Sequence, residues 1–197
     1  SSQPAARSVR TAPSSRAPVI CGFHWETTIP NFMSAADGSC GIRLRFDEAS
    51  ENRLARYDRV RLDLNGCRLT RTAAPDCMTL TGVQALNVLS VAPGTAADLP
   101  VKERSVATLT DDDIYTYVTL KEIEFPVRKG SITPVNEGYA IGTNAHRISK
   151  YPLLVRDING DDMYMLTNTN CAYRSDGTRL PYGSGKISGV IVHERFS

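Results

Sequence analysis

Apolar and polar side chains alternate with a period of two over much of the chain. Between residues 40 and 46, apolar residues alternate with two arginines. A period of two places every second side chain on the same face of a β-strand, so this segment predicts a strand with one buried face. Residues 58–69 repeat the pattern and contain Asn65-Gly66, a pair that can take positive φ at a turn or bulge. We interpret 58–69 as a second, longer strand.

Further segments carry β-rich patterns bounded by glycine, asparagine, aspartate and proline. They are 77–91, interrupted by Gly82; 115–125, whose two faces are mixed; 151–157; 162–168; and 185–196, where Gly189 suggests a bend or bulge. The one helix candidate begins at Thr110, a residue suited to an N-cap, but the β-branched and aromatic residues that follow favour a strand. The pattern therefore predicts an all-β protein.

The order of these signals is repeated along the chain. Residues 41–69 and 151–196 each show a strand, an acidic turn, a variable segment and a long strand, with Tyr57 or Tyr182 near a glycine or aspartate. Two small five-stranded barrels fit this repeat, because each copy would have an ordinary domain size.

We place the division between the two units where the apolar pattern lapses, between about residues 99 and 114. The predicted domains are residues 19–106 and residues 107–197. Residues 1–18 are rich in Ser, Pro, Ala and Arg without any periodicity. We expect a disordered leader or tether there.

Composition narrows the function only slightly. The 197 residues carry 23 Lys plus Arg against 21 Asp plus Glu, and the net charge of +2 neither demands nor excludes a nucleic-acid or glycan partner. No apolar run approaches the ~18 residues of a membrane-spanning helix, and a signal-peptide pattern is missing from the N-terminus. We expect a folded, mature or trimmed chain.

The cysteines point to no metal or redox site. Their spacing lacks C-x-x-C pairs, and their density is below that of a disulfide scaffold. The favoured interpretation is that they are small buried hydrophobic residues, although a Cys67–Cys77 bridge across a strand turn stays open. The five are Cys21, Cys40, Cys67, Cys77 and Cys171.

The sequence DINGDD, residues 157–162, raises the question of a calcium loop. Asp157 and Asn159 match positions 1 and 3 of an EF-hand loop, but Gly160 stands at position 4 instead of 6, and position 12 is Asn168 instead of glutamate. Asn159-Gly160 between two β-rich runs is typical of a two-residue type I′ turn. We therefore predict a hairpin and no metal site.

Catalytic patterns are missing from the sequence. His24, His146 and His193 fall in three separate segments, without the spacing of a metal-binding helix. Nucleophile elbows, phosphate-binding loops and dinucleotide glycine patterns do not occur. We predict that the chain is not an enzyme and uses no cofactor.

Three stretches resemble a known family: GIRLRFDEASENRLARYDRVRLDLNGCRL at 41–69, LTDDDIYTYVTLKEIEF at 109–125, and residues 151–194. They are similar to the uncharacterised OB-like domain family of Bacteroidetes surface and periplasmic lipoproteins, and the resemblance covers about residues 19 to 196. It implies two tandem OB-like five-stranded Greek-key barrels. It also implies export to the periplasm or outer-membrane surface, with membrane contact only through a lipid anchor outside this chain.

Aromatic residues are the first candidates for ligand contact in barrels of this type, since flat rings stack on bases or on sugar faces. Tyr173, Arg174 and Tyr182 belong to a loop that either binds a ligand or packs over a barrel mouth. Trp25 shares a face with Phe23, which favours a buried plug over a binding platform.

Four arginines are the second candidate. If the strands at 40–46 and 58–69 pair, then Arg43, Arg45, Arg59 and Arg61 share an outward face that suits phosphates or acidic sugars. A solvated face balanced by nearby aspartates is the favoured alternative.

The resulting expectation is a non-catalytic extracellular binding module whose partner is a glycan or a protein. A structural spacer or interaction domain that positions neighbouring domains is the alternative. Single-stranded nucleic acid is the third option, and the balanced charge and scarce lysine argue against it.

Overall fold

The computed structural model describes residues 32–36, 40–126, 150–168, 180–181 and 183–193. Strands and short 3₁₀ turns make up the regular structure of these ranges, and no α-helix occurs within them. The predicted all-β class is therefore confirmed at this level. The same ranges contain no helix with the length and apolar character that a membrane crossing requires.

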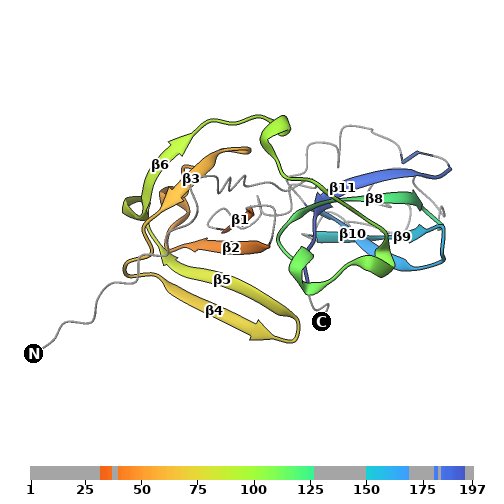
Figure 1. The fold of residues 1–197 in the computed structure, drawn as a ribbon, viewed down its shortest axis with the longest axis horizontal. Coiled ribbons are helices and arrows are strands. Elements are labelled where there is room, and N and C mark those ends of the chain that lie inside the picture. Colours follow the sequence, from red (N-terminus) through yellow and green to blue (C-terminus); the bar gives the residue numbers. More distant parts are fainter. Residues whose placement is uncertain (1–31, 37–39, 127–149, 169–179, 182, 194–197) are drawn as a thin grey trace, which may run out of the picture.

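The first half of the chain forms a four-stranded sheet and a separate strand pair (Figure 1). The bounds are Phe32–Ala36 for β1, Gly41–Phe46 for β2, Arg59–Leu62 for β3, Arg68–Ala73 for β4, Asp76–Val83 for β5 and Val88–Ala92 for β6. The sheet has the order β1-β2-β5-β4, in which β2 and β5 run parallel and the other neighbours run antiparallel. β3 pairs antiparallel with β6.

The first core consists of apolar side chains from the sheet and from the strand pair. Leu44 and Phe46 of β2 are fully buried with Leu80 and Val83 of β5, and Leu62 of β3 packs against this cluster. The strand predicted at 40–46 is therefore confirmed. Its alternation works because one face of β2 meets the core while the arginines point away from it.

The single long strand predicted over 58–69 is wrong. The chain forms β3, turns after Leu64, and begins β4 in a different sheet. Within this turn the Cys67 amide donates to the Leu64 carbonyl at 3.1 Å, and Gly66 takes a φ of +81°. The asparagine-glycine signal thus marks a change of sheet rather than a bulge within one strand.

The second sheet has the order β11-β8-β9-β10, and β7 runs parallel to β8 (Figure 1). The bounds are Lys102–Arg104 for β7, Tyr117–Glu124 for β8, Lys150–Asp157 for β9, Asp162–Asn168 for β10 and Gly185–Val190 for β11. The last strand in sequence lies beside the first of the four, which is the Greek-key order. As far as the described strands go, neither this sheet nor the first one closes into a barrel.

A β-bulge in β8 explains the mixed faces of the sequence at 115–125. Val118 and Leu120 are buried, and the next buried residue is Ile123. Between the pairs Ile187–Leu120 and Gly185–Ile123, β8 has one residue more than β11, and Glu122 takes a φ of +52°. The extra residue moves the inward face by one position. The irregularity faces Gly185 to Ile187, whereas Gly189, where a bend was predicted, pairs regularly with Val118.

The hairpin predicted at residues 157–162 is confirmed, but its turn is not type I′. The Gly160 amide donates to the Asp157 carbonyl at 3.0 Å, and the Asp157 amide donates to the Asp161 carbonyl at 3.0 Å. Gly160 has a φ of +88°, while Asn159 does not have positive φ. This geometry is that of a three-residue loop with glycine in the left-handed position. A type I′ turn would need positive φ at two residues.

Asp157 organises this hairpin from inside the protein. Its side chain is 3% exposed and accepts hydrogen bonds from the amides of Asn159, Asp161 and Val106 at 2.9, 3.0 and 3.3 Å. The acidic residue that suggested calcium therefore binds backbone donors. Across the residues that the structure describes, no three His, Cys, Asp or Glu side chains are grouped to hold a metal ion.

A second buried carboxylate, Asp113, stabilises the segment before β8. Thr110 is the N-cap of a 3₁₀ turn at Asp111–Asp113, and its amide donates to Asp113 at 3.0 Å. Lys102 and Arg104 of β7 lie 3.3 and 3.4 Å from the same carboxylate, which is 1% exposed. Burial raises the pKa of Asp113, but the Thr110 amide and the two cations outweigh burial and leave the pKa below its ordinary value.

Tyr115 connects this segment to the first sheet. A Cβ atom on Gly41 would lie 2.4 Å from the carbonyl carbon of Tyr115, so only glycine permits the observed approach. The Arg43 guanidinium stacks over the Tyr115 ring at 5.9 Å, and the Asp76 amide donates to the Asp111 carboxylate at 2.8 Å. Burial raises the pKa of the Tyr115 hydroxyl, an effect that Arg43 opposes.

The cysteine expectations are only partly met. Cys77 lies opposite Thr72 in the β4–β5 hairpin, whereas Cys67 precedes β4 and has its sulfur 3.7 Å from the Gly82 carbonyl. Five residues of strand separate Cys67 from Thr72, roughly 17 Å at about 3.4 Å per residue. Both are free thiols, so the alternative of a Cys67–Cys77 bridge does not apply. Both are half-buried, and Cys40 is exposed rather than buried.

Asp113 should make unfolding depend on pH. Because its pKa is lower in the folded than in the unfolded chain, its contribution is complete above the unfolded value of about 3.9 and is lost as the pH falls through the folded pKa. Asp113→Asn should cost about 3 kcal/mol of unfolding free energy at pH 7. Urea unfolding at pH 7 and pH 3 should show that this cost shrinks in acid. Asp112→Asn, a change at an exposed neighbour, is the control, and an undiminished cost at pH 3 would contradict the assignment.

Asp157→Ala should destabilise the hairpin, because three partly buried backbone amides lose the carboxylate that accepts their hydrogen bonds. We expect a loss of about 2 kcal/mol or more in the free energy of unfolding, measured by urea unfolding. Asn159→Ala, at an exposed loop position, should change it little. Calcium should leave the melting temperature of the natural chain unchanged, and a calcium-induced rise that Asp157→Ala abolishes would show a metal site instead.

Candidate ligand-binding site

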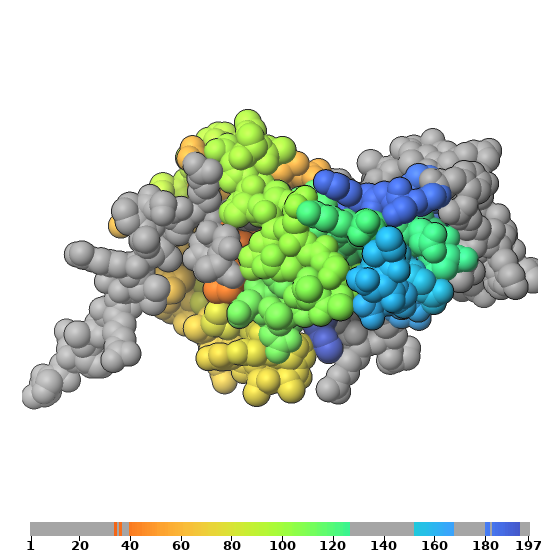
Figure 2. Space-filling view, turned by 45° about the vertical axis from the view of Figure 1, so that its right-hand side comes forward, coloured from red at the N-terminus to blue at the C-terminus, as the bar shows by residue number. Residues whose placement is uncertain are grey.

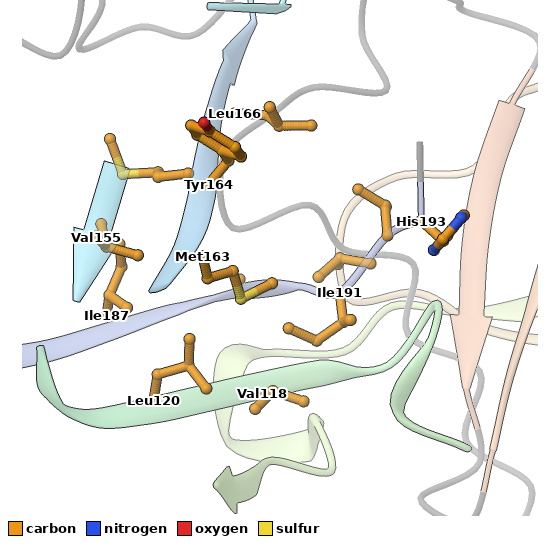
Figure 3. A pocket seen from close by; sticks show the side chains of 13 residues that line it. Val118, Leu120, Val155, Met163, Tyr164, Leu166, Ile187, Ile191 and His193 are labelled. Atoms are coloured by element: carbon orange, nitrogen blue, oxygen red, sulfur yellow. The ribbon is translucent and has the colours of Figure 1, made fainter. Parts of the chain in front are cut away.

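A cavity of about 200 Å³ lies beside the inner face of the second sheet, between its two edge strands β10 and β11. Val118 and Leu120 of β8 form its floor, as Figure 3 shows, and Val155 of β9 lies at one end. Met163 of β10 projects into the middle of the group. All four strands of the Greek-key order therefore contribute to the lining.

The strand register explains why this cavity is apolar and why it exists. Ile187 and Gly189 of β11 lie opposite Leu120 and Val118, so their positions face the same side of the sheet. Gly189 has no side chain, which leaves space beside Val118. Several lining residues, including Val118, Leu120 and Val155, also belong to the second hydrophobic core. The cavity is thus a part of this core that side chains do not fill.

Polar side-chain groups are confined to the rim. Tyr164 is 55% exposed on β10, and His193 is exposed just beyond β11. In Figure 3, His193 stands at the opposite end of the cavity from Val155. Aspartate, glutamate, lysine and arginine are absent from the lining that the described residues provide. The cavity can bury an apolar group of a ligand, with Tyr164 and His193 as the polar side chains at its rim. The lining that the described residues provide contains no carboxylate pair and no nucleophile beside a base.

The pattern of apolar and polar residues does not predict this cavity. The one available signal is the pair Met163 and Met165 in β10, two of the four methionines in the chain. Methionine is flexible and fills irregular spaces, so two of them on the same strand face are consistent with an incompletely packed interior.

The site residues proposed from the sequence are not among the residues that the structure describes. Trp25, Tyr173, Arg174 and Tyr182 all fall outside the described residues, as do His24 and His146. Their assignment as ligand contacts, plugs or surface residues therefore stays a prediction.

The four-arginine face is contradicted by the sheet topology. Arg43 and Arg45 belong to β2, which pairs with β1 and β5, whereas Arg59 and Arg61 belong to β3, which pairs with β6. The two strands face each other across the first core, because Leu44 and Leu62 pack together there. Each arginine pair points away from this core, so the two pairs lie on opposite sides of it.

A network of exposed charges surrounds a second, polar hollow at the bulge of β8. Lys121 lies 2.5 Å and Lys186 lies 3.5 Å from the Glu103 carboxylate. The hydrogen bond from Lys121 is the main reason that the pKa of Glu103 is lower than usual. Because all three side chains are well exposed, this network contributes little to stability. The two lysines are already paired with Glu103, so this hollow is a weaker candidate for ligand binding than the apolar cavity.

No protein-family model, no curated protein and no solved structure matches the sequence or the fold.

Proposed function

We propose that the chain is a non-catalytic binding module and that the cavity between β10 and β11 receives an apolar group of its ligand. The observation that carries this proposal is the composition of the lining, which draws apolar side chains from four strands and keeps polar groups at the rim. Burying apolar surface there yields about 25 cal/mol per Å². A pocket of this chemistry supports recognition better than catalysis, since no described lining residue forms an acid–base pair.

The finer parts of the proposal rest on the sequence resemblance. They are two tandem OB-like barrels, export to the periplasm or outer-membrane surface, and origin in a surface lipoprotein. The Greek-key order of the second sheet supports the first of these, because OB-like barrels are built on that connectivity. Protein partners with an exposed apolar side chain are the ligands that suit the pocket.

The cavity gives less support to polar ligands. A sugar has hydroxyl groups that would find few partners among the apolar side chains, and a nucleic acid requires positive charge that the described lining does not supply. A glycan would therefore use another surface of the module. The spacer alternative predicts that the cavity is a packing defect without affinity for any solute.

Methionine methyl groups provide a direct test. In a chain with ¹³C-labelled methionine methyls, titration with indole should shift the signals of Met163 and Met165 saturably, because both side chains line the cavity. Met78, on β5 of the other sheet, is the internal control. Ile187→Phe should abolish the shifts by filling the space, whereas Leu86→Phe, at a residue 72% exposed, should not.

The outcome separates a binding pocket from a packing defect. Saturable shifts that Ile187→Phe removes would support the binding module. Unchanged methyl signals for Met163 and Met165 at saturating indole, or equal shifts at Met78, would leave the spacer as the better description.

A further inference from the structure

The outer face of the first sheet carries a second surface that is independent of the cavity. Strand alternation places Arg45 of β2, Thr79 and Thr81 of β5, and Arg68 and Thr70 of β4 on the side opposite the first core. We call these five residues the Arg/Thr face. The pairs Thr70–Thr79 and Arg68–Thr81 lie directly across from each other, and Arg45 lies beside the bulge at Thr81 and Gly82.

Much of this face is open to solvent. All six residues of β4 are exposed, and Arg45 is exposed on β2. β4 is the end strand of its sheet, and the β4–β5 hairpin forms the lower margin of the molecule in Figure 1. Its surface is visible at the lower edge of Figure 2.

Within the described strands β2, β4 and β5, the Arg/Thr face carries arginines and no carboxylate. The only carboxylate within β2, β4 and β5 is Asp76, which falls on the opposite side of the hairpin. Asp76 binds Arg71 there, through a hydrogen bond of 2.6 Å and a second contact between the same groups. Arg71 is thus paired on the other side of the hairpin, while the Arg/Thr face combines guanidinium groups with hydroxyl groups.

The spacing of the groups favours an extended ligand. Arg45 and Arg68 lie on either side of β5, about two strand spacings or roughly 10 Å apart at the backbone. Thr79 and Thr81 lie on β5 between them. Arg43, two residues before Arg45 on β2, lies on the same side of the sheet. Its guanidinium stacks over the Tyr115 ring. A linear polymer crossing the strands would meet cationic and hydroxyl groups in succession.

We propose that the Arg/Thr face binds an anionic polysaccharide. A guanidinium presents a planar fork that matches sulfate and carboxylate oxygens, and threonine hydroxyls both donate to and accept from sugar hydroxyls. A polysaccharide offers the threonine hydroxyls many hydroxyl partners, whereas a nucleic acid backbone offers few, so the face suits a glycan better than a nucleic acid. This site does not rest on the apolar cavity, and either can fail without the other.

The chain contains a matched pair of double variants for the test. Arg45→Gln with Arg68→Gln removes two charges from the Arg/Thr face. Arg59→Gln with Arg61→Gln removes two charges from exposed positions on the opposite side of the first core. Binding of a fluorescent heparin oligosaccharide by fluorescence polarisation should weaken about tenfold or more for the first variant and about twofold or less for the second. Neutral dextran should not bind the natural chain.

Each other outcome overturns the proposal. Equal weakening by both double variants would show attraction to net charge rather than to a site. A missing heparin signal would exclude the site, and tighter binding of oligo-dT than of heparin, lost in the same variant, would assign the face to nucleic acid. If Arg45→Gln lowers the melting temperature, heparin binding is compared between the single variants Arg68→Gln and Arg61→Gln instead.

The methyl signals of Met163 and Met165 should not respond to heparin, which keeps this test separate from that of the cavity.

Discussion

The contact between Gly41 and Tyr115 determines how the two halves of the described chain meet. The backbone of β2 approaches the Tyr115 carbonyl so closely that a side chain at residue 41 has no space. Tyr115 is held from its other side as well, since its amide donates to the Ile191 carbonyl at 2.8 Å just beyond β11. The first sheet, the start of β8 and the end of β11 are therefore connected through one residue, and Ile191 is also part of the cavity lining.

Two buried carboxylates stabilise turns beside the second sheet, Asp113 before β8 and Asp157 in the β9–β10 hairpin. Asp113 and Asp157 each accept backbone amides, and each also links segments distant in sequence: Asp113 through the cations of β7, and Asp157 through the Val106 amide. Open sheets without α-helices leave many turn amides to satisfy. A buried carboxylate accepts several of these amides at once, and their hydrogen bonds offset the free-energy cost of removing its charge from water. Asp113 and Asp157 thus stabilise turns of the fold through backbone amides.

The two sheets differ in the surface chemistry they offer. The second sheet leaves an apolar cavity between its edge strands, whereas the first sheet presents arginine and threonine on the side away from its core. The two proposals therefore place an apolar group of a protein partner and an anionic polymer at separate surfaces. Among the described residues, neither surface contains a carboxylate pair or an activated nucleophile.

The sequence by itself determined the all-β class, the strands at 40–46, 151–157 and 162–168, and the hairpin at Gly160, because a period of two and a glycine at a turn act locally. Only the tertiary structure decided that residues 58–69 divide between two sheets and that Glu122 shifts the inward face of β8, since bulges and strand partners depend on distant segments. For the same reason the arginine face was assigned to the wrong strands: Arg45 shares its face with Arg68, and Arg59 does not. The cavity could not be predicted from the sequence, because the unfilled space arises where four strands pack together and no single segment encodes it.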